Sequence, residues 1–90
     1  MNTLIISYDL KKPGKDYTKV HNYIQSFPEW AKPLESFYII KTNLTAQTVI
    51  NQLLQHVDYN DKVIVIDVRN NFATWNNLPS EISEWIKINF

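Results

Sequence analysis

Short runs of β-branched and aromatic residues alternate with helical stripes along this chain, and their order constrains the fold most strongly. Four segments predict strands: residues 3–9, 30–35, 36–42 and 62–68. The second and third are joined by a tight turn near Glu35-Ser36, and Pro33 places the second at an edge or a bend. The last, KVIVIDV, is apolar enough to be central or buried on both faces.

Two segments between these strands repeat apolar residues at helical spacing. The first helix is predicted from about Tyr17 to Phe27, with Asp16 as its N-cap. The second follows Thr45, a suitable N-cap, with Leu44 placed to form a hydrophobic staple. Its predicted core stripe consists of Val49, Ile50, Leu53, Leu54 and Val57.

The order of the elements predicts an α+β fold, a ferredoxin-like βαββαβ sandwich with an additional C-terminal strand and helix. The extra strand is Phe72–Trp75, and the extra helix opens at Pro79-Ser80. We interpret residues 1–90 as a single domain in which 69–90 form a C-terminal extension at a dimer interface. A chain this short buries a small core, and dimerisation would cover the apolar extra strand.

Right-handed crossovers give this fold the strand order 4-1-3-2. Asp9 at the end of the first strand, Ser36 in the turn and Asp61 before the fourth strand then lie on one edge of the sheet. Asp67 lies toward the opposite edge and is a poor partner for Asp9.

Composition narrows the range of functions. The chain has no cysteine, so disulfides, zinc-thiolate sites and thiol nucleophiles are excluded. Nine basic and nine acidic residues give zero net charge, so any nucleic-acid contact has to come from a local patch or one doubled by symmetry. The apolar runs are far shorter than the ~20 residues of a membrane span. We therefore expect a cytoplasmic protein without a membrane partner.

Asp9 is the candidate metal-binding and catalytic residue. Two Asp9 carboxylates, one from each subunit, would be able to hold Mg²⁺ or Mn²⁺ through waters and activate one water against a phosphodiester. The alternative is that Asp9 caps the following turn through backbone N–H groups. Ser36 is a second catalytic candidate, because its hydroxyl can bond a metal-bound water or a phosphate; alternatively it satisfies the tight bend.

Lys11, Lys12 and Lys15 surround Gly14 just before the first helix and are the candidate nucleic-acid-binding residues. A glycine turn at a helix N-terminus exposes backbone amides that bind phosphate. The alternative is an ordinary solvated loop.

The histidines are assigned to structural roles, and the tryptophans have two possible interpretations. His21 and His56 fall on the predicted helices without ligand spacing, so we assign both to structure. The three tryptophans, Trp30, Trp75 and Trp85, either stack on bases or lie in the core and at an interface. Trp75 and Trp85 are expected to anchor a dimer.

Three segments carry a resemblance to a known family. They are Tyr8-Asp9-Leu10, Ser36-Phe37-Tyr38 and the run from Asn60 to Ile66, and their order and spacing cover about residues 3–68. In these features the chain resembles the CRISPR-associated Cas-two family and its VapD relatives, and it is most similar to the branch labelled SinR-like.

The resemblance implies a ferredoxin-like homodimer in which the extra strand completes the partner's sheet and the two Asp9 side chains face each other. It also implies either a Mg²⁺- or Mn²⁺-dependent endonuclease acting on RNA or DNA, or a noncatalytic bridge for DNA. The chain departs from the family in its neutral charge and in Ile39-Ile40, which stand where the family has an acidic-glycine step. A noncatalytic module that binds nucleic acid or protein is the alternative function.

Overall fold

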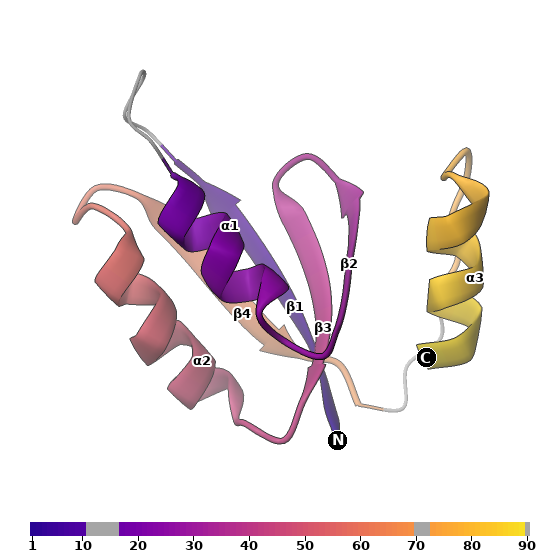
Figure 1. The fold of residues 1–90 in the computed structure, drawn as a ribbon, viewed down its shortest axis with the longest axis horizontal. Helices are drawn as coiled ribbons and strands as arrows, with labels where there is room; N and C mark the ends of the chain where they lie inside the picture. Colours follow the sequence, from indigo (N-terminus) through magenta and orange to yellow (C-terminus); the bar gives the residue numbers. More distant parts are fainter. Residues whose placement is uncertain (11–16, 70–72, 90) are drawn as a thin grey trace.

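A four-stranded antiparallel sheet, two helices on one of its faces and a third helix beside it make up the fold (Figure 1). The computed structural model describes residues 1–10, 17–69 and 73–89. The elements in chain order are β1 (Asn2–Asp9), α1 (Thr18–Gln25), β2 (Glu29–Leu34), β3 (Phe37–Thr42), α2 (Ala46–Leu53), the 3₁₀ turn η1 (Leu54–His56), β4 (Lys62–Asp67) and α3 (Ser80–Asn89). The strand order β2-β3-β1-β4 confirms the predicted 4-1-3-2 arrangement and the βαββαβ order.

The core lies between the sheet and the pair α1 and α2 (Figure 1). Successive side chains of a strand point to opposite faces, so alternate residues of β1 turn toward the helices. The fully buried members of this cluster are Leu4, Ile6, Val20, Ile24, Tyr38, Ile40, Val49 and Leu53. We call this side of the sheet the covered face and the other side the second face.

Helix α2 begins as predicted and ends earlier than predicted. The Thr45 hydroxyl oxygen accepts a hydrogen bond from the Thr48 amide at 3.2 Å, which confirms the N-cap. The α-helix stops at Leu53, and the chain tightens into the 3₁₀ turn η1. Leu54 is therefore 50% exposed, and its assignment to the core stripe was wrong, because only Val49 and Leu53 of α2 are buried.

Helix α1 is shorter than the predicted Tyr17–Phe27. It begins at Thr18, with Tyr17 in the N-cap position, and ends at Gln25. The predicted cap residue Asp16 lies outside the described residues. Phe27 continues the chain as a turn, since its amide donates to the Ile24 carbonyl at 3.3 Å.

Strand β4 is an edge strand, which corrects the expectation that it is central or buried on both faces. It pairs with β1 on one side. On the second face, Ile64 is 53% exposed and Ile66 is 43% exposed. The continuous apolar run from Val63 to Ile66 suggested double burial, but α2 covers only one of the two faces.

The predicted extra strand is not formed by the residues that the structure describes there. Phe72 lies outside the described residues, and Ala73–Trp75 have no strand conformation. Residues 73–78 instead run across the second face, and the Trp75 indole donates to the Ser83 hydroxyl at 3.0 Å. This bond ties the segment to α3 and leaves it crossing the sheet instead of lying along an edge.

The predicted C-terminal helix is present as α3, and it packs against β2 within the same chain. Ile86 is buried at the contact. The Trp85 indole donates to Glu29 Oε2 at 3.2 Å, and Lys41 Nζ donates to the Asn89 carbonyl at 3.1 Å. These contacts hold α3 to its own sheet, so Trp85 anchors α3 here; a role for it at a dimer interface stays a prediction. No helix in the described ranges is long and apolar enough to cross a bilayer.

Candidate functional site

Asp9 lies at the exposed end of β1, directly opposite Lys62 of β4. Because Leu4, Ile6 and Tyr8 face the core, Asp9 falls on the second face together with Ile5 and Ser7. Asp9 and Lys62 share a shallow hollow of about 240 Å³ with Ser7, Tyr8, Val63 and Ile64. The arrangement places one carboxylate and one ammonium group at the same end of the sheet.

The turn between β2 and β3 is fastened to the end of β1. The Ser36 carbonyl accepts from the Tyr8 amide at 3.2 Å and from the Ser7 hydroxyl at 3.1 Å. The Tyr8 hydroxyl donates to the Glu35 carbonyl at 3.4 Å. The structure therefore brings Ser36 to the edge that carries Asp9, as predicted, and the Ser36 carbonyl makes these contacts.

Asp61 also lies at this edge, as predicted, and both of its carboxylate oxygens accept hydrogen bonds. Oδ1 accepts from the Tyr17 hydroxyl at 3.0 Å, and Oδ2 accepts from the Asp58 amide at 2.8 Å. Asp61 thus fixes the loop before β4. Asp67 lies at the far end of β4, where one oxygen pairs with Arg69 Nε at 2.9 Å.

The candidate phosphate-binding residues Lys11, Lys12 and Lys15 lie outside the described residues. Within the described ranges no three His, Asp or Glu side chains gather into a metal-binding group. Among the described residues that line this hollow, Asp9 is the one that carries a carboxylate.

A second polar cluster, on the covered face, was missed by the sequence reasoning. Tyr8, His21 and Tyr38 pack together, with Tyr8 stacked on Tyr38 at 6.3 Å and edge-on to His21 at 6.0 Å between ring centroids. The Tyr38 hydroxyl lies 3.2 Å from His21 Nδ1 and accepts from Gln25 Nε2 at 2.9 Å. The signal was available, because His21 and Gln25 stand four apart on one helix face.

Burial changes the protonation behaviour of this cluster. Burial, and then the neighbouring Tyr38 hydroxyl, raise the pKa of Tyr8 to about 12. Burial, and then the positive charge of Lys32, lower the pKa of His21. The Tyr38 oxygen accepts from Gln25, which leaves its own proton able to point to His21 Nδ1; in that tautomer the neutral imidazole carries its proton on Nε2.

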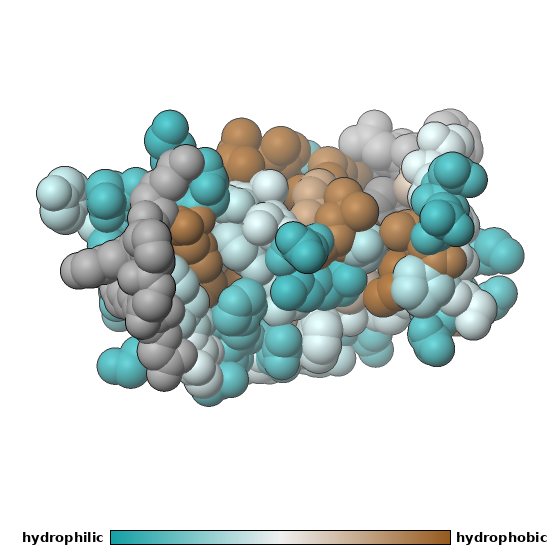
Figure 2. All heavy atoms as spheres, turned by 90° about the horizontal axis from the view of Figure 1, so that it is seen from above, coloured by the Kyte–Doolittle hydropathy of each residue, from teal (hydrophilic) through white to brown (hydrophobic). Residues whose placement is uncertain are grey.

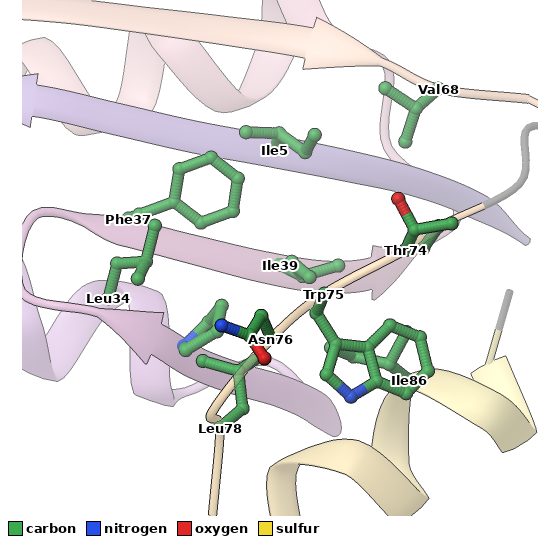
Figure 3. A pocket seen from close by; sticks show the side chains of 12 residues that line it. Ile5, Leu34, Phe37, Ile39, Val68, Thr74, Trp75, Asn76, Leu78 and Ile86 are labelled. Carbon is green, nitrogen blue, oxygen red and sulfur yellow. The ribbon is translucent and has the colours of Figure 1, made fainter.

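A larger hollow lies on the second face, beneath the segment that leads into α3 (Figure 3). Its volume is about 640 Å³, within the range of small-molecule pockets. Figure 3 shows Trp75 and Asn76 on the segment that crosses β3 and β2, with Phe37 and Ile39 on the sheet below. The full lining is Ile5, Pro33, Leu34, Phe37, Ile39, Val68, Ala73, Thr74, Trp75, Asn76, Leu78 and Ile86.

Comparison of the chain with protein families, with curated proteins and with solved structures gives no match.

Proposed function

We propose that the protein is a Cas-two-like, SinR-like homodimer that acts as a Mg²⁺- or Mn²⁺-dependent endonuclease through a pair of Asp9 carboxylates. The observation that carries the proposal is the position of Asp9 on the second face, at the end of the same strand ladder as the exposed Ile64. The apolar part of this face supplies the contact between two subunits, and its polar end supplies the reacting groups.

The apolar side chains of the second face favour association. Ile64 and Ile66 leave about half of their surfaces in water, and Leu34 is also exposed. Removing apolar surface from water stabilises a contact by roughly 25 cal/mol per Å². Figure 2 shows groups of hydrophobic side chains at the surface among hydrophilic ones. A two-fold dimer pairs this face with itself, since the same patch serves both subunits.

The Asp9 pair fits a divalent cation in number and kind of ligand. Mg²⁺ is held by one or two carboxylates together with waters and substrate phosphate oxygens, and two subunits supply two carboxylates. A cation held there would neutralise phosphate charge and lower the pKa of a coordinated water. Lys62, which lines the same hollow, adds a positive charge for the phosphate of the substrate. Ser36, at the same edge, is the second candidate for a contact with that phosphate.

The alternative is a noncatalytic dimer that binds nucleic acid or protein, and the larger hollow favours it. That hollow and the exposed apolar residues are present whether or not Asp9 binds a cation. In this alternative, Asp9 caps the turn that follows β1.

Asp9→Asn separates the two functions, because it removes the charge and keeps the shape of the side chain. For the endonuclease, we expect a light-scattering mass of two chains and a melting temperature that rises with Mn²⁺ in the wild type. In Asp9→Asn the Mn²⁺ response and any cleavage of RNA or DNA are lost. Saturation at about 100 times Kd would stabilise the wild type by about 2.7 kcal/mol.

Glu81→Gln on α3 is the matched control, since it also removes one acidic charge, and it should keep the wild-type response. A dimer without any Mn²⁺ response, in which Asp9→Asn lowers the melting temperature, assigns the noncatalytic function. A mass of one chain at micromolar concentration contradicts both functions.

A further inference from the structure

The outer strand β2 carries an aromatic ring and a cation on the covered face. Trp30 pairs with the buried Ile40 across the ladder, so its indole lies on the helix side of the sheet. Its ring centroid lies 5.9 Å from that of Tyr38, in an edge-to-face contact. Lys32 Nζ lies 5.7 Å from the centroid of the same Tyr38 ring.

His21 of α1 completes a group of three side chains around Tyr38. Its ring centroid is 6.1 Å from the Tyr38 centroid. Tyr38 itself is fully buried, whereas Trp30 remains 37% exposed and Lys32 is exposed. The three side chains therefore cover Tyr38 and present their outer surfaces away from it, at the border between α1 and β2.

Lys32 gives this group of side chains a positive charge. Lys32 makes no salt bridge with any residue that the structure describes. In the tautomer in which Nδ1 accepts from the Tyr38 hydroxyl, the neutral His21 ring carries its proton on Nε2. Glu29, the nearest acid along β2, is engaged by the Trp85 indole from α3.

We propose that Trp30, Lys32 and His21 form a binding site for a small anion that carries a planar ring. The anionic group takes the Lys32 ammonium and the His21 Nε2–H as donors, and the ring packs on the exposed part of the Trp30 indole. A charge-assisted hydrogen bond provides the stronger contact, and stacking on an aromatic side chain adds to it. A ring without a charge, or a charge without a ring, uses only half of the site.

Two sources supply this ligand chemistry, a nucleoside monophosphate and an aromatic carboxylate. Both combine one compact anionic group with a flat ring. The site lies on the covered face, whereas Asp9 lies on the second face, so the proposal does not depend on the endonuclease or on the dimer.

Titration followed by NMR of the tryptophan indole and histidine ring protons tests the site, with AMP, indole-3-acetate and inorganic phosphate as probes. We expect AMP or indole-3-acetate to shift the Trp30 and His21 signals at concentrations at which phosphate has no effect. Tighter binding of AMP identifies the nucleotide as the source, and tighter binding of indole-3-acetate identifies the carboxylate. Equal binding of phosphate and both ring compounds overturns the proposal.

Lys32→Gln should weaken the preferred probe about tenfold, as expected for a hydrogen bond to a charged group. Lys87→Gln on α3 removes the same charge at an exposed position and should leave the affinity unchanged. Trp30→Leu should also weaken binding about tenfold. If Lys32→Gln and Lys87→Gln bind alike, or if Trp30→Leu binds like the wild type, the assignment is wrong; a thermal melt of each variant shows that it is folded.

Discussion

The two faces of the sheet are built from the same strands but differ in what covers them. On the covered face, α1 and α2 bury Leu4, Ile6 and Ile40 completely. On the second face, residues 73–78 and α3 cover Ile39, while Ile64 and Ile66 stay exposed. A single chain thus buries the apolar side chains of the covered face but leaves Ile64 and Ile66 on the second face exposed to water.

This difference indicates where the protein stabilises itself and where it is able to meet another molecule. Isolated exposed apolar residues are common, but neighbouring ones beside a large hollow mark an interaction surface. The covered face should therefore respond to mutation in every condition. The exposed part of the second face, at Ile64 and Ile66, should respond only when a second molecule is present.

Leu53→Ala and Ile64→Ala test this contrast most strongly. Leu53 is fully buried, so its truncation should reduce the free energy of unfolding by roughly 2–5 kcal/mol through a core cavity. Ile64 is 53% exposed, so its truncation should cost about 0.5 kcal/mol or less in dilute protein. Urea melts at low and high protein concentration measure both. If the second face is a dimer contact, the loss of unfolding free energy in Ile64→Ala should grow with protein concentration. An equal loss in both variants in dilute protein would contradict the difference between the two faces.

Thr45→Ala tests the support of the covered face at the start of α2. Loss of the hydroxyl that accepts from the Thr48 amide should cost about 1 kcal/mol. Thr45→Ser keeps the oxygen and is the matched control, and it should melt near the wild type. A neutral Thr45→Ala in a urea melt would show that the cap contributes nothing to α2.

The smallest effect concerns pH and again belongs to the covered face. The pKa of His21 is lowered by burial and by Lys32, so the unfolded chain binds a proton more readily than the folded one. Its contribution to stability is complete above the unfolded pKa of about 6.5 and is lost as the pH falls below that value. Urea melts at about pH 7.5 and about pH 5.5 should show lower stability at the acidic pH.

His21→Gln should reduce that difference, and His56→Gln, on the turn after α2, should preserve it. A pH difference that is the same in the wild type and both variants would assign the effect to other groups.

The sequence predicts the covered face well because its signals are local. A helical stripe, the cap at Thr45 and the strand alternation each depend on neighbouring residues, and together they lead to the observed strand order. The same rules place Asp9 and Ser36 at one edge, because that follows from the order alone. The cluster of Tyr8, His21 and Tyr38 required the packing of α1 on β3, which the strand order does not specify.

The second face was harder to predict because its cover is not local. The apolar KVIVIDV run contains residues suited to burial on both sides, yet nothing within it shows whether the second side meets the same chain. Likewise, Ala73–Trp75 have the composition of a strand, but a strand needs a partner. The Trp75 bond to Ser83 and the packing of α3 decide the path of this segment within the chain.

The position of β1 in the sheet affects how the chain folds during synthesis. Strand β1 lies between β3 and β4, so its second ladder requires residues 62–67, which are synthesised well after β1. Pairing between such distant segments is slow compared with helix formation. Until β4 has been synthesised, β1 has one unpaired edge, and the nascent chain is open to association with other unfinished chains during that interval.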